Sequence, residues 1–194
     1  KAQREETPEA IRLSVPIIKD IIRAYRIPIL EVAGYEADDV IGTLATKAGQ
    51  QGITTYMMTP DKDYGQLVTE HVFMYRPKYG DKEFEVMDIE QVKAKFDIQS
   101  PSQVIDMLGL MGDASDNIPG CPGVGEKTAQ KLIAEFGNIE NLLEHTDQLK
   151  GALKTKVETN REMITFSKFL ATIKTDVPIE LDMSALVREQ PDEE

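Results

Sequence analysis

The segment Met111–Ile133, MGDASDNIPGCPGVGEKTAQKLI, combines two features within one short stretch. Asp113 and Asp116 come first, and a turn with three glycines then leads into a stretch with helical spacing. Paired carboxylates suit a cation, whereas glycines and a helix N-terminus let backbone N–H groups approach a phosphate. We interpret the segment as a site for a cation and a phosphate backbone. The alternative is a solvated turn followed by a helical hairpin whose tight turn needs glycine.

A second acidic motif, GYEADDVIG, covers residues 34–42 and contains Glu36, Asp38 and Asp39. It follows a short apolar run and precedes an amphipathic stretch, which predicts acids at the start of a helix just after a strand. Acids at that position stabilise a helix by about 0.3–1 kcal/mol each. Ordinary helix chemistry is therefore the alternative explanation of this motif.

A third acidic motif, TPDKDYGQL, covers residues 59–67 and places Asp61 and Asp63 at the carboxyl end of a predicted strand. Ligands of open α/β sheets bind outside those strand ends. The alternative is that Asp61 caps a short helix.

The three motifs together indicate a metal site. Several carboxylates at one sheet edge raise one another's pKa and are unfavourable without cations. Ligation by carboxylates alone suits Mg²⁺ or Mn²⁺, and two such ions ~4 Å apart would activate a water for phosphodiester hydrolysis. His71 and His145 are isolated and Cys121 is the only cysteine, which excludes a zinc site and an internal disulfide. The candidate metal ligands are Glu36, Asp38, Asp39, Asp61, Asp63, Asp113 and Asp116.

The net charge of −12 argues at first against a nucleic-acid partner. The three motifs and the tail EQPDEE carry nearly all of this excess, however, so the rest of the chain is almost neutral. At 41% hydrophobic residues the chain can bury a core. It has no apolar run near the ~18 residues needed to span a bilayer and no signal peptide, so we expect no membrane partner.

Periodicity predicts an α/β layer followed by a helical region. The apolar residues of 9–25 recur at helical spacing, and residues 27–32 and 53–58 are predicted strands. Helices are predicted over 37–48 and 62–68, and a hairpin over 72–86. Strands that alternate with helices favour a parallel sheet with helices on both faces. Further helices are predicted over 89–96, 103–111, 126–136, 139–145 and 161–173. The predicted division is 1–98 for the α/β core, 99–189 for the helical region and 190–194 for a disordered tail.

These motifs, with FGNIENLL at 136–143, resemble in order and spacing the 5′-nuclease domain of bacterial DNA polymerase I, within the flap-endonuclease superfamily. The resemblance covers Lys1 to about Val187. It implies a PIN-like α/β parallel-sheet core and a helix–three-turn–helix DNA-binding region. It also implies hydrolysis at 5′ flaps and 5′ ends, including RNA primers, in the bacterial cytoplasm, and a polymerase domain in the parent chain.

The resemblance also implies roles for individual residues. Glu36, Asp38 and Asp39 would belong to a first metal region, and the other four candidate acids to a second. Lys1 and Arg4 would end a helical arch and act on the scissile phosphate or on the flap. The glycine turn would grip the duplex backbone, often with K⁺ on its carbonyls. Its predicted DNA-binding residues are Gly120, Gly123, Val124, Gly125, Lys127, Thr128 and Lys131.

The chain departs from this family at its beginning. It opens on Lys1, whereas the family's domain begins with a strand that carries a further metal-binding aspartate. We expect a truncated domain with weak or absent nuclease activity. A duplex-binding module without catalysis is therefore an alternative. A phosphatase using Asp61 and Asp63 is a third reading, but those enzymes usually carry Thr or Val where this chain has Gly65.

Overall fold

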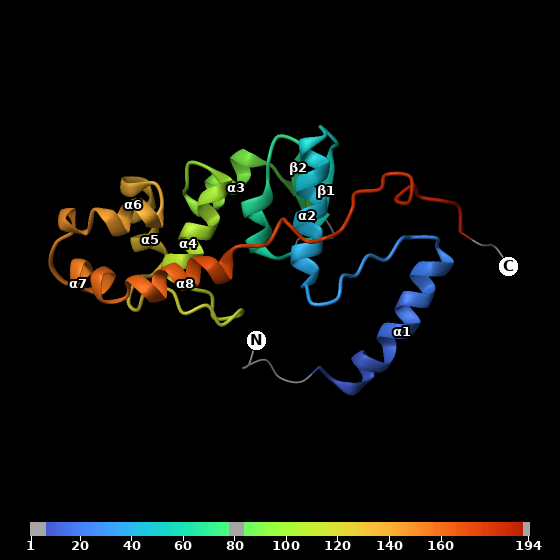
Figure 1. The fold of residues 1–194 in the computed structure, drawn as a ribbon, viewed down its shortest axis with the longest axis horizontal. Helices are drawn as coiled ribbons and strands as arrows, with labels where there is room; N and C mark the ends of the chain where they lie inside the picture. Colours follow the sequence, from blue (N-terminus) through green and yellow to red (C-terminus); the bar gives the residue numbers. More distant parts are fainter. Residues whose placement is uncertain (1–6, 78–83, 192–194) are drawn as a thin grey trace.

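The structure, a computed structural model, describes residues 7–77 and 84–191. Figure 1 shows α5, α6 and α7 at one end, the sheet and α2 in the middle, and α1 apart at the other end. The helices are α1 (Glu9–Ala24), α2 (Ala37–Gln50), α3 (Ile89–Phe96), α4 (Val104–Met111), α5 (Glu126–Phe136), α6 (Ile139–Glu144), α7 (Gly151–Thr159) and α8 (Arg161–Ala171), with short 3₁₀ helices η1 (Lys62–Leu67), η2 (Pro101–Gln103) and η3 (Thr146–Gln148). The strands are β1 (Thr55–Met58), β2 (Val72–Pro77) and β3 (Phe84–Met87).

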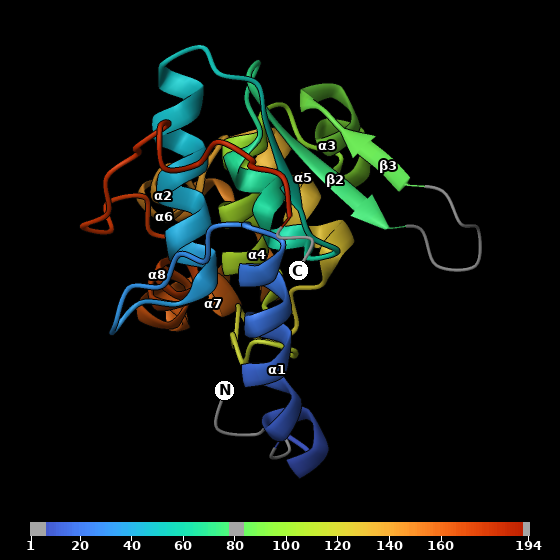
Figure 2. The same ribbon diagram turned by 90° about the vertical axis from the view of Figure 1, so that its right-hand side faces the viewer.

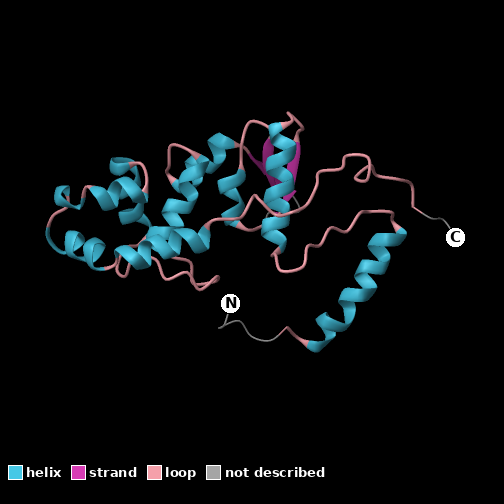
Figure 3. Cartoon of the chain, viewed as in Figure 1, coloured by secondary structure: helices cyan, strands magenta, loops and turns pink. Residues whose placement is uncertain are grey.

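The three strands form one sheet in the order β1-β2-β3. Figure 2 shows β2 and β3 side by side, and Figure 3 marks the strands in magenta. β1 and β2 are parallel, with Thr55 opposite Val72, and β2 and β3 are antiparallel. Side chains alternate between faces, so Met57 and Met74 are buried while Tyr56 and Met58 remain 57% and 72% exposed. The α/β class is confirmed, but the expectation of helices on both faces is wrong for this part of the sheet.

The predicted strand at 27–32 is also wrong, because this segment is irregular. A strand needs a neighbour for its N–H and C=O groups, and no described strand pairs with it. Pro28 also lacks an N–H to donate. The preceding helix α1 forms as predicted, but none of its residues is buried.

The helical half packs around α4, which is apolar on nearly all sides and largely buried. Gly109 lets α6 and α8 approach α4 closely, since a Cβ there would lie 2.7 Å from Ile139 Cδ1. Asp106 of α4 accepts bonds from Lys168 Nζ at 2.6 Å and from the Ile139 N–H at 2.9 Å. This buried carboxylate therefore ties three helices together.

The sequence pattern did not predict α7, where only Val157 is buried. A helix with one buried side chain has almost no apolar periodicity to detect. The main hydrophobic core runs without interruption from Met57 and Met74 in the sheet to Leu132 and Ile164 in the helical half. The predicted division near residue 98 remains a prediction, and the two parts share this core.

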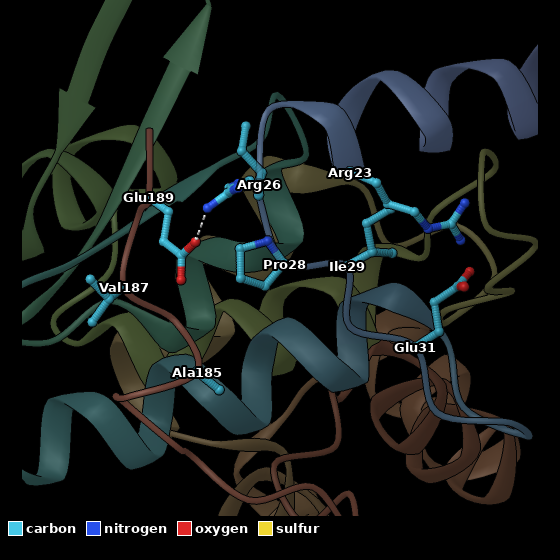
Figure 4. A pocket seen from close by; sticks show the side chains of 9 residues that line it. Arg23, Arg26, Pro28, Ile29, Glu31, Ala185, Val187 and Glu189 are labelled. Atoms are coloured by element: carbon cyan, nitrogen blue, oxygen red, sulfur yellow. Dashed lines mark hydrogen bonds and ion pairs between the residues drawn. The ribbon is translucent and has the colours of Figure 1, made fainter. Parts of the chain in front are cut away.

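The segment after α1 lies beside the C-terminal segment (Figure 4). Arg26 Nη1 and Glu189 Oε2 are 2.8 Å apart there, across a hollow that none of the candidate acids lines. Within the described ranges, no helix is both long and apolar enough to cross a membrane.

Candidate metal centre and glycine turn

The first acidic group lies at the start of α2, as predicted. Glu36 is the N-cap, and its N–H donates to Asp39 Oδ2 at 3.3 Å. Asp39 Oδ1 also accepts the Lys174 N–H at 3.0 Å, so this side chain connects α2 to the segment after α8. Asp38 Oδ1 accepts the Tyr64 hydroxyl at 2.9 Å, which connects α2 to η1. Local helix chemistry and long-range contacts therefore both hold these acids in place.

The second acidic group follows β1, also as predicted. Asp61 caps η1 by accepting the Asp63 N–H at 3.0 Å, which is the capping alternative considered for this residue. Asp63 points inward and is only 8% exposed. Its Oδ1 is buried and accepts no hydrogen bond from the part of the chain that the structure describes. Burying a carboxylate oxygen without a partner costs folding free energy, and a bound cation would supply the missing partner.

The third acidic group lies on the loop after α4. Asp113 forms an isolated bridge with Ile118 and accepts the Ser115 N–H at 2.7 Å. The Lys62 ammonium pairs with Asp113 Oδ2. Burial opposes the charge of Asp113, but the bonds from Lys62 and Ser115 outweigh it and lower the pKa of Asp113. Asp113 therefore stays ionised next to Asp63.

Tertiary packing brings these groups together. Ligand oxygens of Asp63, Asp113 and Asp116 lie within 4.8 Å of one another, although Asp63 belongs to η1 and the other two to the loop after α4. A cleft of about 420 Å³ joins Asp63 and Asp116 to the α2 acids. Asp116 also lines an adjoining cleft of about 410 Å³, together with Asp61 and Asp113. All seven candidate acids therefore line two clefts that meet at Asp116.

The electrostatics of Asp63 match a cation site. Burial, followed by the charges of Asp61 and Asp113, raises the pKa of Asp63 to about 7. Without a cation, this group therefore holds its proton near neutral pH. The donor set of carboxylate oxygens suits Mg²⁺ or Mn²⁺, so the residues present fit the metal that the acidic motifs predict.

The pH dependence of stability follows from Asp63. Folded Asp63 keeps its proton up to about pH 7, whereas the unfolded carboxyl loses it near 3.8, so the native state binds more protons between these values. We expect the free energy of unfolding, measured by urea titration with a chelator, to fall as pH rises from 5 to 8, by at most about 1.4 kcal/mol per pH unit from this group. Asp63→Asn removes this contribution. An unchanged slope in that variant would contradict the assignment.

The glycine turn links the acidic loop to α5. Gly120 and Gly123 have φ of 65° and 75°, a region that favours glycine. The Gly120 N–H donates to the buried Ser167 Oγ at 3.0 Å, so α8 anchors the turn. Gly125 is the N-cap of α5, and its carbonyl accepts the Thr128 N–H. Sequence reasoning missed Ser167, because nothing in its neighbourhood marks it.

The predicted DNA-binding residues divide by exposure. Gly123, Gly125, Lys127 and Lys131 are exposed and Thr128 is half-buried, whereas Gly120 and Val124 are buried. The Lys156 ammonium lies 3.2 Å from the Gly123 carbonyl, on the turn where K⁺ is predicted. Lys1 and Arg4 lie outside the described residues.

Sequence reasoning also assigned no site role to Lys62 and Tyr64. Both occur in TPDKDYGQL, between or beside the aspartates, and both contact a candidate acid from another motif. The available signal was their position directly next to a candidate ligand on a tight 3₁₀ turn.

Two family models together cover almost the entire chain. The model described as 5′-3′ exonuclease, N-terminal resolvase-like domain, matches residues 1–97, and the one described as 5′-3′ exonuclease, C-terminal SAM fold, matches residues 99–194. The chain belongs to the 5′-3′ exonuclease family. The predicted resemblance and the predicted fold class are confirmed.

Curated relatives agree with this family. DNA polymerase I of Bacillus caldotenax is 43% identical over 195 residues, covering 100% of this chain and 22% of the relative. DNA polymerase I of Bacillus subtilis (strain 168) is 45% identical, covering 96% of this chain and 21% of the relative. A 5′-3′ exonuclease of Aquifex aeolicus is 38% identical, covering 99% and 64%. The chain thus spans about a fifth of the length of these DNA polymerase I relatives.

Solved structures show the same fold. The T5 5′-exonuclease with bound zinc matches with a TM-score of 0.71 at 22% identity, covering 90% of this chain and 64% of that one. The catalytic core of Rad2 in complex with a DNA substrate matches with a TM-score of 0.62 at 17% identity, covering 96% and 60%.

Proposed function

We propose that this chain is a divalent-metal-dependent 5′ nuclease domain that hydrolyses phosphodiesters at 5′ ends and 5′ flaps of DNA. Family membership supports the reaction class, and the acidic clefts support the metal dependence. The observation that carries the proposal is the convergence of Asp63, Asp113 and Asp116 around a buried carboxylate oxygen without a partner. The T5 5′-exonuclease structure contains divalent metal ions, and the Rad2 catalytic core is in complex with a DNA substrate.

Each group of residues has a proposed task. Asp63, Asp113 and Asp116 hold one Mg²⁺ or Mn²⁺ ion, and Glu36, Asp38 and Asp39 face a second across the same cleft. Bound metal would supply a nucleophilic water at neutral pH and stabilise the leaving oxygen, with no covalent enzyme intermediate. Tyr64 and the Lys174 N–H hold Asp38 and Asp39 in position.

The helical half has the task of holding duplex DNA. The exposed backbone of Gly123 and Gly125 and the ammonium groups of Lys127 and Lys131 present donors to phosphates, which position a duplex without reading its sequence. The proposal also includes a K⁺ ion bound to the turn carbonyls and an RNA primer–DNA hybrid as a substrate. It further places the protein in the bacterial cytoplasm, with a polymerase domain in the parent chain.

The test is cleavage of a 5′-labelled flap duplex by this chain in Mg²⁺ and in Mn²⁺, with a chelator control. We expect weak metal-dependent release of the flap. Metal-independent binding of the duplex with no release, in a protein shown to be folded, would instead favour the binding module. Hydrolysis of a small phosphate ester without flap release would favour the phosphatase reading.

The proposed duplex contact makes a separate prediction. A Lys127→Ala/Lys131→Ala variant is expected to bind duplex DNA more weakly, with the slope of log K against log salt reduced by about 1 to 2, because two phosphate contacts are lost. Fluorescence anisotropy in a chelator at several salt concentrations measures this. Lys154→Ala, which removes one lysine of an exposed pair with Glu158 on α7, is the control. Equal slopes in all three proteins would contradict the contact.

A further inference from the structure

The cleft that adjoins the acidic triad is also lined by basic residues. Three cationic side chains line it from three different elements, namely Lys62 from η1, Arg76 from β2 and Lys95 from α3. Figure 2 shows β2, β3 and α3 next to one another in this part of the molecule. Asp61, Asp113 and Asp116 line the same cleft, where Lys62 pairs with Asp113. The cleft therefore leads directly from the proposed metal ligands to a group of positive charges.

Arg76 lacks the partners that a guanidinium normally finds. Within residues 7–77 and 84–191, its buried Nε has no hydrogen-bond partner, and its Nη1 donates only to the Met87 sulfur, at 3.8 Å. Glu85 lies opposite Arg76 in the strand register, yet the two form no ion pair. Among the residues that the structure describes, no carboxylate oxygen lies within 4.0 Å of either Arg76 or Lys95. An arginine fork with unused donors fits a phosphate oxygen.

Lys95 stands in the same electrostatic environment. Partial desolvation, followed by the charge of Arg76, lowers the pKa of Lys95, and Glu85 only partly offsets this. The repulsion between two neighbouring cations is relieved when an anion binds between them. Lys95 is also solvent-exposed, so an anion reaches it without rearrangement. Lys62 differs from the other two because Asp113 already neutralises it.

We infer that Arg76 and Lys95 together bind a backbone phosphate of the DNA strand being cut, next to the phosphodiester held at the acidic triad. This inference rests on the proposed nuclease function, which supplies the nucleic acid at the adjoining cleft. Neither residue belongs to the acidic motifs or to the glycine turn. The contact gives the substrate strand a second anchor, on the opposite side of the scissile position from the α2 acids.

The test compares Arg76→Ala/Lys95→Ala with wild type in binding a 5′-flap duplex, by fluorescence anisotropy in a chelator. We expect Kd to rise about tenfold at low salt and the slope of log K against log salt to fall by about 1. Lys93→Ala is the matched control, since Lys93 is on α3 and pairs with Glu90 at 2.9 Å, outside the cleft. Arg76→Lys keeps the charge and is expected to keep the slope.

A neutral methylphosphonate, placed at single positions around the cleavage site, locates the contact on the DNA. A methylphosphonate at the phosphate next to the scissile one should weaken binding of the DNA by the wild-type protein. It should not weaken binding by the double variant, because that protein has already lost the contact. The inference is overturned if the wild-type protein binds the DNA and the double variant has the same Kd and salt slope as Lys93→Ala. It is also overturned if no methylphosphonate position affects the wild type and the double variant differently. In both cases the nuclease function stands. If wild type neither binds nor cleaves the flap duplex, the proposed function fails first.

Discussion

Asp63→Asn is expected to lower metal-dependent flap cleavage by at least about 100-fold, because it removes a ligand oxygen from the proposed metal site. Loss of a residue that merely supports a metal ligand already costs about 10- to 100-fold in affinity or activity. The same variant should weaken Mn²⁺ binding, measured by titration calorimetry without DNA. This second readout tests the site independently of the catalytic rate.

Asp63→Asn should also stabilise the protein in a chelator at pH 8. At that pH the wild-type chain must keep a buried carboxylate ionised next to Asp61 and Asp113, whereas asparagine is neutral. A higher melting temperature combined with weaker metal binding is typical of a functional site that is maintained at the expense of stability. Asp147→Asn, an exposed aspartate in η3, is the control and should change neither quantity. Equal Mn²⁺ affinity in Asp63→Asn and wild type would contradict the metal assignment.

Gly120→Ala is expected to destabilise the protein by about 3 kcal/mol or more. Its φ of 65° disfavours any side chain, and an added Cβ would lie 2.7 Å from Gly112 Cα, where only backbone atoms are available to move. Because the Gly120 N–H also joins the turn to Ser167 of α8, the acidic loop before the turn should loosen as well. Urea unfolding measures the first effect, and Mn²⁺ affinity measures the second.

Gly125→Ala is the matched control for this substitution. Gly125 belongs to the same turn, but its φ is −96° and a Cβ there would meet nothing within 4 Å. We expect a change of less than about 1 kcal/mol, since alanine is only a poorer N-cap. If both variants lost the same stability, the backbone clash at Gly120 would not be the cause.

Local patterns predicted most helices and much of the site, since both depend on near neighbours in the chain. The cap of η1 by Asp61 was recognisable from the neighbouring residues, and the α2 acids were predicted at the start of their helix. The three acidic motifs identified the seven carboxylates that line the two clefts. The strand at 27–32 was predicted wrongly because a strand depends on a partner elsewhere in the chain. The helix α7 was missed because it buries one apolar side chain.

The sequence by itself determined the family, the α/β class, the acidic residues and the glycine turn, because these depend on residue types at short spacing. Only the tertiary structure decided which acids meet. It brought Asp63 of η1 to Asp113 and Asp116 after α4, left one Asp63 oxygen without a partner and paired Lys62 with Asp113. It also placed Arg76 and Lys95 beside the same cleft. Burial and charge proximity across segments set these properties, and packing of the sheet against η1, α3 and α4 is what creates them.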